Sequence, residues 1–178
     1  PWLSYGSFWD GLQLIRLDKS LTSPAEGAQP FTFASRKSKP GMENPPAIDN
    51  NPADAGGNAI EAPFIFKKGK YYYLFASIDY CCKGVNSTYK MIIGRSKKVE
   101  GPYVDKAGIP LRSGGGTILL ASDKEWYGVG HNAVVSDNGR DLLIFHAYDA
   151  ADNGKSKLRI FSLKWDKKGW PLPDQEIY

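Results

Sequence analysis

The segment GKYYYLFAS at residues 69–77 joins a turn dipeptide to a run of aromatic and apolar residues, a combination typical of a β-strand that follows a tight turn. Similar segments occur at residues 139–148, GRDLLIFHAY, and at residues 1–7, PWLSYGS. Self-similarity at a roughly fixed spacing is typical of propellers and other repeat arrays. Each copy is followed by a second apolar strand, at residues 12–17, 89–96 and 158–163.

Four antiparallel strands are predicted for the second unit, which is the most complete of the three. They cover residues 62–66, 71–77, 89–96 and 101–104. The third unit is predicted to have an inner strand at 132–135, a tight turn at Asn138-Gly139 and an outer strand at 169–172. Four antiparallel strands make one blade of a β-propeller. The first unit lacks an inner strand, so the sequence predicts about two and a half blades of an all-β protein.

These units define the predicted domain organisation, a carboxyl-terminal portion of one β-propeller domain. The boundaries are a partial blade at 1–21, an inter-blade loop at 22–57, a blade at 58–120 and a last blade at 121–178. The loop assignment rests on composition, since this stretch is rich in Pro, Ala, Gly and Asn and poor in branched apolar residues.

Composition excludes several classes of partner. With 178 residues, 42% hydrophobic and 13% aromatic, the chain is predicted to fold as one globular domain. The net charge is +4, but the lysine pairs at 67–68, 97–98 and 167–168 lie beside separate turns, so no nucleic-acid partner is expected. No apolar run approaches the roughly 20 residues that cross a bilayer, so no membrane partner is expected either.

The two cysteines are neighbours, Cys81 and Cys82. Two cysteines cannot form a disulfide framework or a four-cysteine zinc site. A ring that joins neighbouring cysteines is strained, so two buried thiols are the expected state.

The motif NAIEAP, residues 58–63, places the carboxylate of Glu61 at the mouth of a predicted buried strand, residues 64–66. A carboxylate at a strand end is most often solvated or paired with a lysine. Burial of a carboxyl group, in contrast, disfavours its charged form, and a general acid must hold a proton near neutral pH. Glu61 is therefore a candidate general acid.

Other candidates are single aromatic, imidazole or carboxylate side chains. Phe8 and Trp9 are suited to stack on sugar rings or to pack within a blade. His131 begins a predicted inner strand, and a lone histidine is more often structural than a metal ligand. His146 is expected in or near the core, and Asp10 is expected to form a turn.

Four motifs follow one another at residues 3–11 (LSYGSFWDG), 58–63 (NAIEAP), 81–89 (CCKGVNSTY) and 128–132 (GVGHN). In this order they resemble the endo-α-1,5-L-arabinanases of glycoside hydrolase family 43. The resemblance implies a five-bladed β-propeller that cleaves the α-1,5-linked arabinofuranosyl bonds of plant arabinan, or of arabino-oligosaccharides, with inversion. It also implies a secreted or periplasmic protein.

The resemblance assigns roles to particular residues. Glu61 matches the general acid, His131 matches a residue that helps to hold a calcium ion largely through waters, and Trp9 and Phe8 would contact substrate. The family's general base, an Asp on the first blade, and a second, pKa-tuning Asp would both be missing from this chain. Asp49 lies after the Ser7-Phe8-Trp9 segment rather than before it, so it is interpreted as a loop acid. The missing amino-terminal part of the same propeller is the expected partner, and the isolated chain is expected to be weakly active or inactive.

Two alternatives remain open at this point. An exo-acting arabinofuranosidase or β-xylosidase of the same family would share the acid-bearing strand but differ in loops around the cleft. A non-catalytic propeller would bind arabinan through Trp9 and neighbouring residues without cleaving it.

Overall fold

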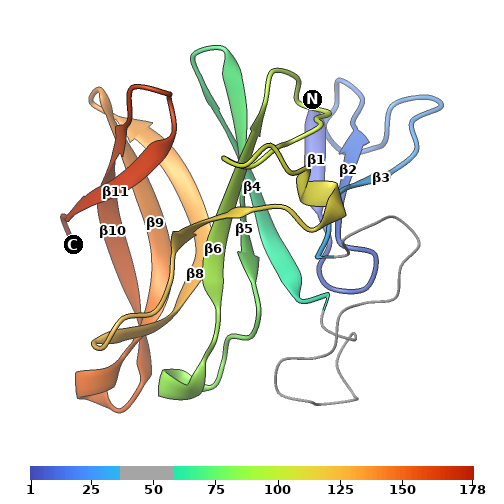
Figure 1. The fold of residues 1–178 in the computed structure, drawn as a ribbon. Helices are drawn as coiled ribbons and strands as arrows, with labels where there is room; N and C mark the ends of the chain where they lie inside the picture. Colours follow the sequence, from blue (N-terminus) through green and yellow to red (C-terminus); the bar gives the residue numbers. More distant parts are fainter. Residues whose placement is uncertain (37–57) are drawn as a thin grey trace. The chain divides into compact units, whose positions relative to one another are not determined.

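The protein is built from β-strands joined by turns and three short 3₁₀ helices, as the computed structural model shows for residues 1–36 and 58–178 (Figure 1). No α-helix occurs in those two ranges, which confirms the all-β fold class. The strands are β1 Trp2–Tyr5, β2 Leu12–Arg16, β3 Phe31–Ala34, β4 Ile60–Lys68, β5 Tyr71–Ile78, β6 Lys90–Ser96, β7 Thr117–Leu120, β8 Trp126–Asp137, β9 Arg140–Asp149, β10 Lys155–Trp165 and β11 Pro171–Glu176. The 3₁₀ helices are η1 Gly84–Asn86, η2 Leu111–Ser113 and η3 Ala150–Asp152.

The strands form three sheets, with the orders β1-β2-β3, β4-β5-β6-β7 and β11-β10-β9-β8. In the last sheet β9 pairs antiparallel with both β8 and β10, and β11 pairs antiparallel with β10. Within each sheet, strands that follow one another in sequence are thus neighbours in space. Two compact units make up the chain, residues 1–74 with 94–117 and residues 75–93 with 118–178.

The predicted outer strand at 101–104 is wrong. Within this stretch only Val104 pairs, through isolated bridges to Arg95 and Pro110, and the fourth strand of that sheet is β7, residues 117–120. Gly101 has a φ of 94°, outside the extended region of a β-strand, so the chain does not continue alongside β6 here.

The predicted loop at 22–57 is also wrong in part, because β3 lies within it and pairs with β2. The sequence FTFA of β3 places Phe33 in the core, where its ring lies 5.8 Å from that of Tyr103. Four residues of strand are too few to outweigh the loop composition around them. Residues 37–57 of the predicted loop, with Asp49, lie outside the described residues.

The two cysteines form a disulfide, so the prediction of two buried thiols is wrong. Cys81 is half-buried and Cys82 is exposed. The physical reason lies in the backbone. Successive side chains point to opposite sides of an extended strand, but this segment is a turn in which Asp79 and Cys82 both have a φ of 68°.

The second unit contains a cationic side chain that is nearly buried among aromatic rings. Arg159 of β10 is 8% exposed and donates two hydrogen bonds of 2.6 Å to the carboxylate of Glu176 on β11. Its guanidinium carbon lies 4.1 Å from the ring centroid of Trp126 on β8 and 4.9 Å from that of Phe161. Arg159 therefore links strands that are not neighbours in the sheet.

Within the part of the chain that the structure describes, no helix has the length and apolar character needed to cross a membrane.

Candidate active site

Glu61 is the second residue of β4 and is half-buried. The next residue, Ala62, has a φ of 53°, in the left-handed region that a residue with a Cβ atom rarely adopts. Such conformations cost about 1–3 kcal/mol and are concentrated at functional sites. The backbone next to the Glu61 carboxylate is therefore strained at Ala62.

A turn that carries two aromatic residues is attached to the start of this strand. The Phe8 N–H donates to the carbonyl oxygen of Ile60 over 2.9 Å. Phe8 and Trp9 also have positive φ values, 54° and 31°, and their ring centroids lie 6.1 Å apart. The first unit therefore brings both predicted substrate-binding aromatics to the residue before Glu61.

The two aromatic side chains differ in exposure. Phe8 is half-buried, whereas Trp9 is 67% exposed. Packing within a blade, the alternative considered for both residues, does not account for an indole ring with two thirds of its surface in solvent.

Asn58 joins three segments around Glu61, and sequence reasoning assigned it no role. It is fully buried, and its Nδ2 donates to the carbonyl oxygen of Trp9. Its Oδ1 accepts from the N–H of Arg36 over 2.8 Å and from the hydroxyl of Ser35 over 3.3 Å. The only sequence signal for this role was a polar residue at the first position of the NAIEAP motif. Its partners, Trp9, Ser35 and Arg36, all lie far from it in sequence.

A groove of about 360 Å³ opens beside Trp9. At its side, Gln13 Nε2 donates to the hydroxyl of Thr32 over 2.8 Å, and that hydroxyl donates to the carbonyl oxygen of Asp10 over 3.1 Å. Asp10 lies in the turn before β2, as predicted, and is exposed. An exposed indole beside hydroxyl, amide and carboxylate groups is suited to bind a neutral polyol such as a sugar. The lining residues are Gly6, Ser7, Trp9, Asp10, Gly11, Gln13 and Thr32.

His131 belongs to the second unit, on β8. It is exposed, has a φ of 53°, and its backbone N–H donates to the hydroxyl of Ser77 over 2.8 Å. Ser77 is fully buried, so this bond fixes the backbone at His131 firmly. The sequence did not predict a role for Ser77. The apolar residues around it do not indicate that its hydroxyl accepts a hydrogen bond from an N–H far away in sequence.

The surroundings of His131 are polar but do not form a metal cluster. His146 is half-buried, stacks on the ring of Tyr89 at 5.8 Å between centroids, and lies 6.5 Å from the ring of His131. Asn132 is 5% exposed, and neither atom of its amide has a hydrogen-bond partner among the described residues. Within residues 1–36 and 58–178, no three His, Cys, Asp or Glu side chains gather as metal ligands. The described residues therefore do not supply a calcium site by themselves, because calcium needs six to eight ligands, mostly oxygen.

Comparisons with known proteins identify the family of the chain. The family model described as glycosyl hydrolases family 43 matches residues 1–171. An extracellular exo-α-(1→5)-L-arabinofuranosidase of Cellvibrio japonicus is 46% identical over 175 residues, which cover 98% of this chain and 48% of the relative. An extracellular endo-α-(1→5)-L-arabinanase of Bacillus subtilis is 44% identical over 171 residues, which cover 96% of this chain and 46% of the relative.

A solved structure gives the same result. The α-L-arabinanase of Cellvibrio cellulosa, complexed with arabinohexaose, superposes with a TM-score of 0.85 and 46% identity. The match covers 97% of this chain and 52% of that one. The chain thus spans about half the length of the relatives that it matches.

Proposed function

The chain belongs to glycosyl hydrolase family 43, and from this we propose that it forms part of an inverting glycoside hydrolase that cleaves α-1,5-linked L-arabinofuranosyl bonds in arabinan. Glu61 is the proposed general acid. The observation that carries the proposal is the strained start of β4, where Phe8 and Asn58 attach the exposed Trp9 to the strand that bears Glu61. Substrate class is supported by relatives named as arabinanases and by one solved with arabinohexaose.

In the proposed reaction, the carboxylic acid of Glu61 protonates the glycosidic oxygen as it leaves. A carboxylate base on the opposite face of the sugar deprotonates a water molecule, which attacks the anomeric carbon. Inverting enzymes hold these two carboxyl groups about 6.5–9.5 Å apart to leave room for that water. We assign the base, and an Asp that tunes the acid, to residues outside these 178, since the chain spans about half the length of its relatives.

The proposed architecture is a five-bladed β-propeller. The two four-stranded sheets would be its last two blades, and the three-stranded sheet would be part of the blade before them. The amino-terminal part of the same propeller is the proposed partner, and the two together are called the complete enzyme below. Secretion is proposed because both curated relatives are named extracellular.

A calcium ion near His131 also stays a prediction. His131 would supply one nitrogen ligand and waters would supply most of the rest. No step of the reaction is assigned to the ion.

The products of linear arabinan distinguish the proposed endo action from its alternatives. We expect the complete enzyme to release short arabino-oligosaccharides early, with the newly formed reducing ends in the inverted configuration by NMR. Arabinose alone from the first minute would instead assign the exo action named for the Cellvibrio japonicus relative. Initial retention of configuration would contradict the inverting mechanism, and binding without cleavage would identify a non-catalytic propeller.

Replacing Trp9 with alanine is expected to raise the KM for arabino-oligosaccharides about tenfold, with a smaller change in kcat. The indole is 67% exposed beside a polar groove, and loss of a stacked aromatic contact costs about 1–1.5 kcal/mol. Initial rates over a range of substrate concentrations measure the effect. Tyr178→Ala removes an aromatic side chain that is 78% exposed outside this groove, so it is the matched control and should leave KM unchanged. An unchanged KM for Trp9→Ala would contradict the stacking role.

A further inference from the structure

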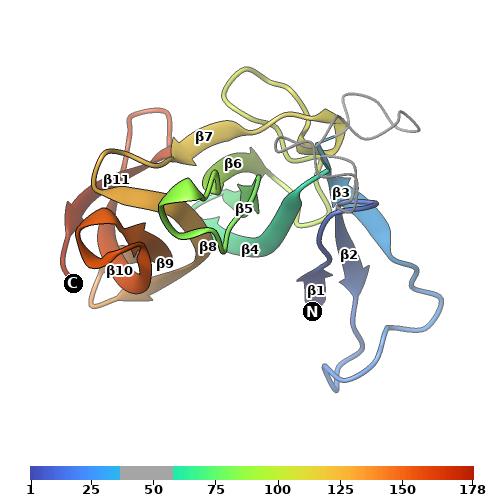
Figure 2. The same ribbon diagram turned by 90° about the horizontal axis from the view of Figure 1, so that it is seen from below.

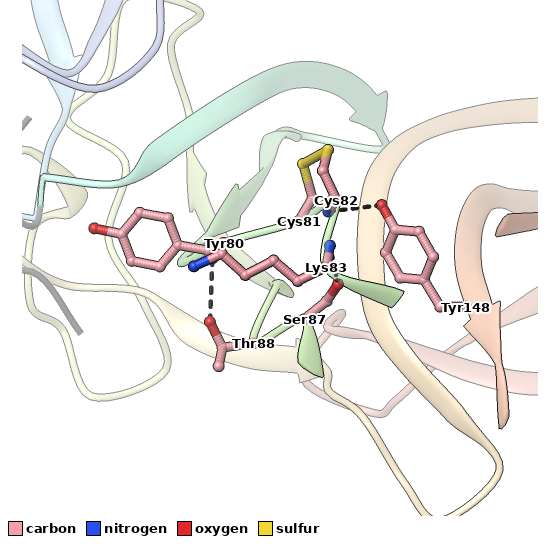
Figure 3. Close-up of a disulfide and its surroundings, with 7 residues drawn as sticks. All are labelled: Tyr80, Cys81, Cys82, Lys83, Ser87, Thr88 and Tyr148. Atoms are coloured by element: carbon pink, nitrogen blue, oxygen red, sulfur yellow. Dashed lines mark hydrogen bonds between the residues drawn. A yellow bond between two sulfur atoms is a disulfide. The ribbon is translucent and has the colours of Figure 1, made fainter. Parts of the chain in front are cut away.

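The Cys81–Cys82 disulfide lies in an exposed loop between β5 and η1 (Figure 3). Its two sulfur atoms point away from Ser87 and Thr88 in the close-up, and Cys82 is exposed. Val85, in the same loop, is 41% exposed. The loop thus presents sulfur and aliphatic carbon to solvent.

Stabilisation of the fold does not account for this bond. A disulfide restricts the unfolded chain more when it closes a longer loop, and the effect is about 3 kcal/mol for a loop of about 15 residues. Cys81 and Cys82 are one position apart, so their bond closes essentially no loop. Its effect is local, because it locks two side chains and the peptide between them into one rigid ring.

Hydrogen bonds hold the rest of the loop in place. The Cys82 N–H donates to the hydroxyl of Tyr148 over 2.8 Å, and the Lys83 N–H donates to the hydroxyl of Ser87 over 3.0 Å. Across the base of the loop, the N–H groups of Thr88 and Tyr89 both donate to the carbonyl oxygen of Tyr80, over 2.9 and 3.0 Å. The Tyr80 N–H in turn donates to the hydroxyl of Thr88 over 3.2 Å (Figure 3).

Close backbone contacts anchor the loop to the last sheet of the second unit. η1 lies beside the η3 turn in both views of the ribbon (Figures 1 and 2). A Cβ atom added at Gly154 would lie 3.0 Å from Gly84, and one added at Gly128 would lie 2.7 Å from the ring of Tyr148. These two glycines permit an approach that larger residues would prevent, so Tyr148 and η1 have fixed positions. An exposed loop that is fixed so thoroughly is more typical of a binding surface than of a connection.

The chemistry of this surface suits one face of a neutral sugar ring. Sulfur is soft and polarisable and contacts C–H groups well, and a locked ring loses no rotamer entropy on binding, which is also the advantage of an aromatic side chain. Two exposed polar side chains follow the cysteines in sequence. Lys83 is exposed, with its ammonium 5.1 Å from the ring centroid of Tyr80, and Asn86 is exposed next to Val85. The carbon face of a furanose would lie on the sulfurs, with its hydroxyl groups toward solvent.

We propose that the Cys81–Cys82 disulfide is a platform that binds one furanose ring of an arabinan chain. The inference rests on the proposed function, because it concerns the same polysaccharide. The proposed platform is recognised by how its contribution to binding depends on the length of the substrate. Such a platform contributes to the binding of chains that are long enough to occupy it, and it does not affect shorter chains.

The test compares the double variant Cys81→Ser with Cys82→Ser against the wild-type complete enzyme, with the oxidised or open state of the cysteines checked by intact mass. KM is expected to rise about five- to tenfold on linear arabinan and to stay unchanged on arabinotriose, with kcat unaffected on both. Tyr148→Phe keeps the sulfurs but removes the hydroxyl that positions Cys82, so we expect a smaller rise of the same kind. Calorimetry with arabinohexaose should show the same loss of affinity when the cysteine variant and its reference both carry Glu61→Gln, which prevents turnover.

An unchanged KM on linear arabinan in the open variant would overturn the platform, as would an equal rise on arabinotriose, which would indicate general disturbance of the loop. A lower melting temperature with unchanged KM would identify the disulfide as a structural clamp and would also overturn it. A wild-type enzyme that does not cleave arabinan would contradict the proposed function instead, which keeps the two failures distinct.

Discussion

Replacing Glu61 with glutamine is expected to lower kcat on linear arabinan by about 10²- to 10⁴-fold, the usual contribution of a general acid. Glutamine has nearly the same shape and can still form hydrogen bonds, but it has no acidic proton to give to the leaving oxygen. Binding should persist, because the contacts of Phe8 and Asn58 at the start of β4 use other atoms. Steady-state rates and calorimetry with arabinohexaose measure the two effects separately.

Glu26→Gln is the matched control for this substitution. Glu26 is an exposed carboxylate in the same unit, and we expect its variant to keep wild-type kcat and KM. A Glu61→Gln enzyme with kcat within about threefold of wild type would show that Glu61 is not the acid.

Arg159→Ala is expected to lower the free energy of unfolding by about 2–4 kcal/mol, the largest effect on stability that we predict. The substitution removes a nearly buried guanidinium that packs on the rings of Trp126 and Phe161 and pairs with Glu176. The Glu176 side chain is 40% exposed, so solvent weakens the ion pair, and the lost ring contacts carry much of the effect. Urea denaturation of the complete enzyme, followed by tryptophan fluorescence, measures the change.

Arg159→Lys separates charge from shape. Lysine keeps the positive charge but cannot form the two parallel hydrogen bonds or stack as a flat group, so a loss of about 1–2 kcal/mol is expected. An alanine variant within about 0.5 kcal/mol of wild type would contradict the role assigned to Arg159.

Most strands were predictable from sequence, and the errors have local causes. The apolar runs that predicted β5, β6, β9 and β10 are separated by clear turn and loop signals. The structure confirms all four strands. The strand β3 was missed because four residues lie within a long stretch of loop composition. The strand at 101–104 was predicted because the second and third units were both expected to close with an outer strand, but the left-handed φ of Gly101 leaves only Val104 paired.

For the candidate site, the sequence predicted individual functional side chains but not the hydrogen bonds that position them. Glu61 was recognisable as a carboxylate just before the apolar run at residues 64–66, but the prediction that this run is buried is wrong, because all three residues are half-buried. Asn58 and Ser77 act through partners that are distant in sequence, and no local pattern identifies such partners. The Cys81–Cys82 bond was predicted wrongly because its geometry depends on a left-handed φ at Cys82, which the residue type does not favour.

The role of Glu61 as proton donor is tested most directly by changing the leaving group. The measurement compares wild type and Glu61→Gln on linear arabinan and on an arabino-oligosaccharide that carries a dinitrophenyl leaving group, which departs without protonation. The account predicts a loss of about 10²- to 10⁴-fold on arabinan and close to wild-type rates on the dinitrophenyl substrate. An equal loss on both substrates would contradict it, because Glu61 would then act on something other than the leaving oxygen.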